Sequence, residues 1–281
     1  MVGGGEQTAF VDIDRVRDKN GQFRGSRKGE RKRPGVGRPI TRGRKRASER
    51  HQKRAVVKPS VPLHIIMRAA PNMPSLRDQG VFAAIRLATY TAFGHDERAI
   101  NSGDASAATK KAGKAFHITH ISIQRTHIHL IVEASDRMAL ARGMQAFGIS
   151  AAKHINAVRT ERARDAGRIR RDQKISGQVF ADRYHAVPLT TPTQVRNTIA
   201  YVLNNWRKHQ EHHVRLAHAW QVDPFSSAIE FEGWRGRNGK AFAKPSWYFS
   251  LFVWEASSWL LRVGWRKLGP VGITETPGGH E

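Results

Sequence analysis

The sequence contains no cysteine. Disulfide bonds, thiolate zinc sites and cysteine nucleophiles are therefore excluded, and the absence is typical of a protein that works in a reducing compartment. Long hydrophobic runs are also missing: no stretch is long enough to span a membrane, and the first residues, MVGGGEQTAF, hold no apolar signal core. We therefore expect a soluble, cytoplasmic protein without a membrane partner.

Acidic residues are scarce relative to basic ones. The 281 residues hold 48 Lys and Arg against 23 Asp and Glu, which gives a formal net charge of +25. A charge of this sign and size favours a polyanionic partner, most often nucleic acid and less often an anionic membrane. The hydrophobic content of 39% is enough for one sizeable core domain with appendages, or for two small domains.

Basic residues are concentrated at the start of the chain. Residues 1–58 are rich in Gly, Arg and Lys and have no hydrophobic period, which predicts a disordered basic arm that attracts phosphates without sequence preference. A minor-groove hook built on the GRP tripeptide of this arm is the alternative. Residues 59–215 are expected to form the main folded domain. Residues 216–281 are expected to form a C-terminal extension, helical over the aromatic stretch 247–265.

The main domain is expected to begin with a strand, a helix and a hairpin. Residues 61–69, VPLHIIMRA, alternate in hydrophobicity and predict a half-buried strand. A helix is expected over 76–93. The segments 116–124 and HIHLIVEA are both strand-like, and a turn at Arg125 and Thr126 would join them as an antiparallel hairpin.

Two further helices and one strand follow in the pattern. Apolar residues spaced by three and four predict a helix over 137–158. A charged, exposed connection then leads to a strand at 178–190. The last helix, 191–210, has an explicit start, with Thr191 as N-cap, Pro192 in the first turn and Gln194 closing a capping box.

The predicted order of elements is β-α-β-β-α-β with an additional helix. This is the split βαβ pattern, which predicts an α+β, ferredoxin-like sandwich. In such a fold one antiparallel sheet carries two helices on one face. We expect its other face to be open.

Two histidines stand at the start of the strand HIHLIVEA. Because residues two apart share a face of a strand, Ile128, Leu130 and Val132 point to the helices, whereas His127 and His129 point to the open face. Two neighbouring imidazoles on one face are a natural chelating pair for a divalent cation. A pair of solvated histidines at the start of a strand is the alternative, and the histidines alone do not decide between the two.

The last helix adds a tyrosine and an amide. Its core stripe consists of Val195, Ile199, Val202 and Trp206. Tyr201 and Asn205, four residues apart, lie one turn from each other on the opposite side. With a chelating histidine pair and a basic surface they supply what phosphodiester transesterification needs, namely a hydroxyl nucleophile, a metal at the phosphate and cations along the strand. Because free tyrosine has a pKa near 10, the metal or nearby cations must help to form the phenolate.

Three segments in this order, THIHLIV, GQVFADRY and YVLNN, resemble the motifs of the HUH endonuclease superfamily. Within it they are most similar to the REP-associated tyrosine transposases, which are single-tyrosine enzymes. DPFSSA, residues 223–228, is similar to a short segment that follows in that family, so the resemblance covers about residues 60–230. Two positions depart from the family pattern: Thr126 stands in place of asparagine, and Trp206 in place of the proline after YxxxN.

The resemblance implies a site and an activity. His127 and His129 match the metal-binding pair, Tyr201 matches the nucleophile, and Asn205 matches the polar residue that completes the metal shell. Residues 59–215 would then be a catalytic domain that uses Mg²⁺ or Mn²⁺ to cleave single-stranded DNA, commonly beside a hairpin. The reaction would leave a 5′-phosphotyrosine link and a free 3′-hydroxyl.

Other side chains are weaker candidates. Tyr184 is the competing nucleophile, although a tyrosine in a strand more often packs or stacks on a base. Candidate contacts to the DNA strand are Arg68, Arg183, Tyr184, His185 and Lys208. A solvated strand end explains Arg183 and His185 equally well. Because Trp206 replaces the proline, the helix is expected to continue through Arg207 and Lys208.

Two alternative functions stay open from the sequence. One is a rolling-circle or relaxase-like HUH nickase, although nothing indicates a helix with paired tyrosines. The other is a nucleic-acid-binding protein without catalysis, in which the sheet face and the basic arm bind strands. The sequence also leaves open whether the protein acts as a monomer or as a homodimer.

Overall fold

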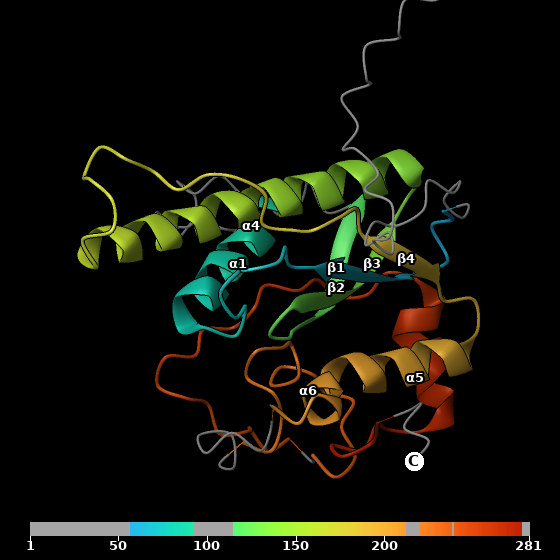
Figure 1. The fold of residues 1–281 in the computed structure, drawn as a ribbon. Helices are drawn as coiled ribbons and strands as arrows, with labels where there is room; N and C mark the ends of the chain where they lie inside the picture. The colour runs from blue at the N-terminus through green and yellow to red at the C-terminus, as the bar shows by residue number, and fades with distance from the viewer. Residues whose placement is uncertain (1–56, 93–114, 212–219, 238, 277–281) are drawn as a thin grey trace, which may run out of the picture. The chain divides into compact units, whose positions relative to one another are not determined.

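Four strands form one antiparallel sheet in the order β2-β3-β1-β4 (Figure 1). The computed structural model of the chain describes residues 57–92, 115–211, 220–237 and 239–276, so almost all of the predicted basic arm lies outside it. The strands are β1 (Leu63–Arg68), β2 (Phe116–Ile123), β3 (His127–Ala134) and β4 (His185–Pro188). Helix α1 (Gln79–Ala92) links β1 to β2, and helix α4 (Arg137–Asp165) links β3 to β4. This topology confirms the predicted α+β fold of the ferredoxin-like, split βαβ type.

One face of the sheet is apolar and lies under α1 and α4 (Figure 1). The strand register places Leu130 of β3 opposite Ile65 of β1 on one side and opposite Ile121 of β2 on the other. All three side chains are fully buried, as are most of their apolar neighbours on this face. Burying such a side chain contributes about 1.5–3 kcal/mol relative to leaving it exposed, so this face holds much of the hydrophobic core.

Helix α4 approaches the sheet closely because it has glycine at the contact. A Cβ atom added to Gly143 would overlap the ring of Phe116 on β2. Gly148, farther along the same helix, is less crowded, because its added Cβ would meet only Met67 Cε at 3.7 Å. The first glycine is therefore required by packing, whereas the second is not.

The opposite face, which we name the histidine face, carries imidazoles on all four strands. The strand register places six of them on this face: His64, His117, His120, His127, His129 and His185. The prediction that this face is open is wrong. Helix α5 (Pro192–Leu203) packs across it, and His129 and Glu133 are each only 2% exposed (Figure 1). The physical reason is the apolar stripe of α5, which needs a surface to cover it just as the first two helices do.

Two helix boundaries differ from those predicted. Helix α4 runs seven residues beyond 158, through the charged segment expected to be a connection, and ends before Gly167, whose φ is 64°. Charged residues with good helix propensity allow this extension, because nothing before Gly167 breaks the helix. The last helix is not continuous: α5 ends at Leu203, Asn204 leaves helical geometry, and α6 (Asn205–Lys208) follows.

The start of α5 is close to the predicted one. Thr191 is the N-cap, its side chain accepts a hydrogen bond from the backbone N–H of Gln194, and Pro192 lies in the first turn. Gln194 Oε1 accepts from the backbone N–H of Thr190 rather than from that of Thr191. The predicted capping box is thus formed, but with its second hydrogen bond shifted by one residue.

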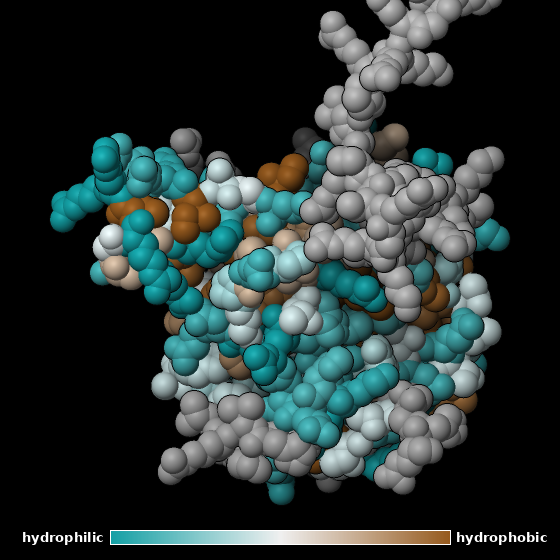
Figure 2. Space-filling model, in the orientation of Figure 1, coloured by the Kyte–Doolittle hydropathy of each residue, from teal (hydrophilic) through white to brown (hydrophobic). Residues whose placement is uncertain are grey.

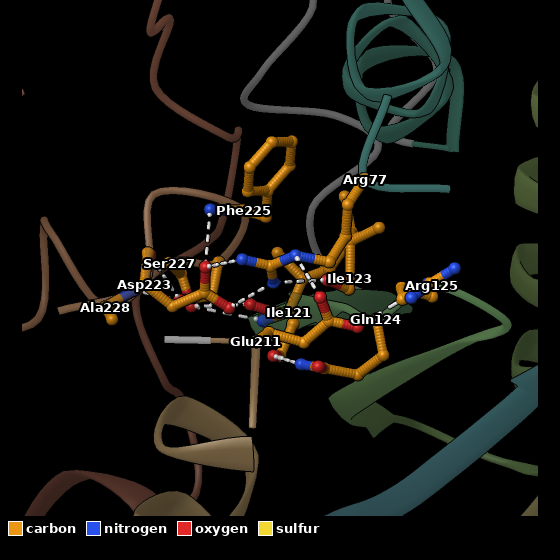
Figure 3. Close-up of polar contacts among 12 residues, drawn as sticks. Arg77, Ile121, Ile123, Gln124, Arg125, Glu211, Asp223, Phe225, Ser227 and Ala228 are labelled. Carbon is orange, nitrogen blue, oxygen red and sulfur yellow. Dashed lines mark hydrogen bonds and ion pairs between the residues drawn. The ribbon is translucent and has the colours of Figure 1, made fainter. Parts of the chain in front are cut away.

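The segment DPFSSA adds backbone pairing to the outer edge of β2 (Figure 3). The N–H of Ile123 donates to the carbonyl of Phe225, and the N–H of Ser227 donates to the carbonyl of Ile121, each at 2.9 Å. Buried Asp223 accepts two hydrogen bonds from Arg77, at 2.8 and 2.9 Å. Such a bidentate pair fixes both charges. The backbone pairing covers an edge of the sheet that would otherwise expose unpaired N–H and C=O groups.

The C-terminal extension is less helical than predicted. Residues 247–257 have no regular helix, and only a π-helical turn (Leu260–Gly264) and a 3-10 turn (Trp265–Leu268) follow. The aromatic side chains account for this, because successive ones pack in separate places: Trp247 on Phe225, and Phe252 on Tyr90. No helix in the described part of the chain is long and apolar enough to cross a bilayer.

Candidate active site

His127 and His129 lie side by side at the start of β3. Their ring centroids are 4.8 Å apart with the planes nearly perpendicular. His127 is partly exposed, whereas His129 is buried beneath α5. Nε2 of His129 is buried and has no hydrogen-bond partner. A buried, unpaired ring nitrogen beside a second imidazole is the arrangement expected of a chelating pair without its ion.

His64 of β1, which the sequence reasoning missed as a site residue, orients His129. Nε2 of His64 lies 3.0 Å from Nδ1 of His129, and the two rings stack with centroids 5.2 Å apart. If Nδ1 of His129 carries the proton and donates it, the unpaired Nε2 presents a lone pair. The opposite tautomer would bury an unpaired N–H, which is the costlier arrangement. The alternation of β1 places His64 on the same face as Arg68. This alternation is the sequence feature that could have identified His64 as a neighbour of the site.

The site imidazoles are neutral at physiological pH. Burial lowers the pKa of His64 and of His127 to about 4, and neighbouring cationic or imidazole groups add to the effect. Burial, reinforced by His64 and His127, lowers the pKa of His129 to about 2. Neutral imidazole is the form that binds a metal ion, so these rings need not lose a proton first.

Tyr201 lies on α5, the helix that covers the histidine face, and its ring packs against His129 and His64. Its ring centroid lies 5.4 Å from that of His129 and 6.0 Å from that of His64, edge to face in both cases. Nζ of Lys208 on α6 lies 5.1 Å from the centroid of the Tyr201 ring. The tyrosine is partly exposed, so the arrangement places a hydroxyl-bearing ring, a cation and two neutral imidazoles at one accessible point.

Helix α6 and the residue after it add one imidazole and one buried amide. The ring of His209, just after α6, lies 5.0 Å from that of His127. Asn205 is fully buried, and neither Oδ1 nor Nδ2 of its side chain has a hydrogen-bond partner. An unpaired buried amide is costly, so the Asn205 side chain needs a hydrogen-bond partner beyond those that the protein offers it. His209 carries no sequence pattern that would have identified it.

The residues present fit a divalent cation, although with few charged ligands. Among the described residues no group of three or more His, Cys, Asp and Glu side chains is arranged to hold a metal ion. The donors would be His127 and His129, with the amide oxygen of Asn205 as the predicted third. Mg²⁺ and Mn²⁺ commonly keep several waters and take substrate phosphate oxygens as ligands, so a three-donor site without carboxylate is chemically adequate when DNA is present.

Of the weaker candidates, Arg68 and His185 lie near this centre. Arg68 is exposed and pairs with His127 in the strand register, and exposed His185 pairs with Ile66 one position along. Arg183 is exposed on the segment before β4. Tyr184 is half-buried and packs on the hydrophobic core, which is the packing role expected of a strand tyrosine.

The C-terminal extension holds α5 and α6 in place. Arg196 donates to the carbonyl groups of Gly269 and Pro270 and pairs with Glu275. Asn204, at the break between the helices, donates to the carbonyl groups of Gly272 and Glu275. These contacts lie on both sides of Tyr201 in the sequence, so the extension fixes the helix that presents the tyrosine. They also explain why the helix breaks at Asn204, whose amide turns to the extension.

Comparison with solved structures finds a likeness, whereas comparison by sequence finds none. No protein-family model matches the chain, and no curated protein matches it. A solved structure, described as that of a REP-associated tyrosine transposase bound to a REP hairpin, is similar to it at 14% sequence identity and a TM-score of 0.40. The match covers 74% of this chain and all of that one.

Proposed function

We propose that the protein is a metal-dependent endonuclease and strand transferase for single-stranded DNA, of the HUH tyrosine transposase type. The observation that carries the proposal is the position of Tyr201, which lies edge-on to His129 and His64 beside the His127–His129 pair. The order of the motifs in the sequence and the net charge of +25 support the same function.

The chain's own residues take the following roles. The hydroxyl oxygen of Tyr201 attacks the phosphorus of one phosphodiester, forms a new P–O bond, and loses its proton to solvent. The P–O bond to the 3′ oxygen breaks, and that oxygen takes up a proton and leaves as a 3′-hydroxyl. The 5′ end of the downstream strand stays on Tyr201 as a phosphate ester, which the 3′-hydroxyl of another strand can attack in the reverse sense.

Several groups prepare this step. His127, His129 and Asn205 would hold Mg²⁺ or Mn²⁺, which when bound supplies Lewis-acid polarisation of the phosphate. Lys208, beside the Tyr201 ring, attracts the negative charge of the incoming phosphate. Exposed Arg68, Arg183 and His185 lie where a strand could be held by its phosphates.

The experiment uses single strands that contain a hairpin with flanking bases, labelled in parallel at the 5′ or the 3′ end, with Mn²⁺ or Mg²⁺. The 3′-labelled product should migrate with the protein after denaturation, and the 5′-labelled product should be a shorter, free strand with an extendable 3′ end. His127→Ala should abolish cleavage and keep most of the strand affinity, because affinity rests on many phosphate contacts.

Arg183→Ala serves as the comparison variant in this experiment, since a lost phosphate contact should weaken binding without abolishing adduct formation. Strand binding with no adduct, for any strand and either metal, would favour the alternative of a nucleic-acid-binding protein without catalysis. Equal loss of binding and cleavage in His127→Ala would make the histidine structural.

A further inference from the structure

A cavity of about 390 Å³ opens next to Tyr201, between the edge strand β4 and helix α5. Val187, Pro188 and Leu189, at the end of β4, give it an apolar side. Asn197 and Thr198 of α5 give it a polar side. Tyr201 and His64 line it as well, so whatever occupies the cavity lies against the proposed nucleophile.

The sequence of α5 creates this polar side. The helix buries Val195, Ile199 and Val202 against the sheet. Asn197 and Tyr201, four residues apart, therefore lie on a different side of the helix, one turn from each other. Asn197 is exposed and Thr198 is half-buried. Their polar groups are therefore accessible to a ligand and are not buried in the core.

The chemistry of the lining selects an uncharged, planar ligand. The described residues that line the cavity include no lysine and no arginine, although the chain as a whole carries a net charge of +25. A phosphate group would find no fixed cation there. The amide of Asn197 offers one donor and one acceptor side by side, which is the pattern that reads the edge of a nucleobase, and the apolar side can pack on the face of its ring.

We propose that this cavity receives a single unpaired nucleobase next to the phosphodiester that Tyr201 attacks, and that Asn197 reads the edge of that base. The proposal rests on the proposed function and adds to it the site that selects where the strand is cut. With the base held against α5, the adjacent phosphate lies beside Tyr201, and exposed Arg68 and Lys208 can contact the rest of the backbone.

The test measures binding only and uses Tyr201→Phe protein without metal, so that no cleavage occurs. A hairpin-containing single strand is scanned by placing an abasic site at each unpaired position in turn, and the dissociation constant is measured for each strand. At one position the abasic strand should bind about tenfold more weakly than the intact strand. Adding Asn197→Ala should remove most of this difference at that position and leave the other positions unchanged.

Thr193→Ala is the matched control, because Thr193 is an exposed polar residue of α5 outside the cavity. It should leave the full abasic penalty in place. If Asn197→Ala and Thr193→Ala give the same penalty at every position, the proposal is overturned. Displacement of the strand by free nucleosides, with no dependence on abasic position, would assign the cavity to a free nucleoside and would also overturn it.

The result of this binding test can be distinguished from the result of the adduct experiment that tests the proposed function. If the covalent adduct forms but no position couples to Asn197, the cavity proposal alone fails. If one position couples to Asn197 but no adduct forms, the base site stands and the catalytic assignment fails.

Discussion

The hydrogen bond between His64 and His129 sets which nitrogen of His129 faces the candidate metal position. Replacing His64 by leucine removes the acceptor of this bond and should weaken Mn²⁺ binding about 10–100-fold, because the imidazole loses its fixed tautomer and orientation. Replacing it by glutamine should preserve most of the affinity, because Oε1 of glutamine can accept from Nδ1 of His129. Calorimetric titration of the DNA-free protein with Mn²⁺ measures both.

His185→Ala is the control for this pair, because His185 lies on the same face of the sheet but is exposed. It should leave Mn²⁺ affinity unchanged. Equal affinities for the leucine and glutamine variants would show that His64 acts by packing and not by its hydrogen bond.

At this scale the sequence predicts His127, His129 and Tyr201 as neighbours, because each occupies a recognisable motif, and the structure places them together. It does not predict His64 or His209. A lone histidine in a strand or after a helix belongs to no motif. His64 reaches the site because β1 lies beside β3, and His209 because the end of α6 lies close to His127. The metal roles of His127, His129 and Asn205 remain predictions.

Helix α4 provides a test of how the helices pack on the apolar face of the sheet. Gly143→Ala should destabilise the protein, because the added methyl group overlaps Phe116, at a cost of about 1–3 kcal/mol for overpacking. Gly148→Ala, in the same helix, should instead stabilise it by up to about 1 kcal/mol, since alanine has the higher helix propensity and the space is open. Thermal unfolding of the two variants should therefore move in opposite directions. Stabilisation by both would contradict the close approach of α4 to β2.

The elements themselves were mostly predictable, and the failures share one cause. Strand alternation and helix periodicity identify β1, β3, α4 and α5, because each has a regular apolar stripe. The break at Asn204 and the irregular path of 247–257 were not predictable, because they depend on contacts between distant segments, such as Asn204 with Gly272. The apolar spacing up to Trp206 predicts a continuous helix at the first place, and tertiary hydrogen bonds override it. At the second place aromatic packing decides the path of the chain.

At the scale of the whole molecule, the histidine face should make folding sensitive to mild acid. His120 lies beyond the candidate site, packed on Phe231, and burial lowers its pKa to about 4, with Glu133 opposing and Arg266 adding to the effect. Between pH 6.5 and pH 4 the unfolded chain binds a proton at this residue and the folded chain does not. Its contribution to stability therefore falls as the pH falls through this window.

His120→Gln removes this titration. The free energy of unfolding of the wild-type protein should fall faster than that of the variant between pH 7 and pH 4, by about 3 kcal/mol in total. Glu133 does not confound the comparison, because it titrates in the wild-type protein and in the variant alike; burial raises its pKa, and hydrogen bonds from His117, Ser257 and Ser258 lower it overall to about 2. Chemical denaturation at several pH values measures the difference, and parallel curves would contradict it.

The surface of the molecule carries its basic character beyond the site. Figure 2 shows hydrophilic side chains around the end of α4 and the loop after it. Arg168, Arg170, Arg171 and Lys174 are exposed in this loop. Net charge is readable from the sequence without the fold, whereas the coverage of the histidine face by α5 and the C-terminal extension is not. The sequence could therefore indicate a polyanionic partner but not the shape of the site that receives it.

The central claim is that Tyr201 forms a covalent bond with DNA, and peptide mapping of the protein–DNA adduct tests it most directly. After cleavage of a labelled strand in Mn²⁺, the adduct is digested with nuclease and protease, and the peptide that keeps a nucleotide is identified by mass spectrometry. We expect a 5′-phosphotyrosine at Tyr201 and no adduct in Tyr201→Phe. A nucleotide on Tyr184, or an adduct that persists in Tyr201→Phe, would contradict it.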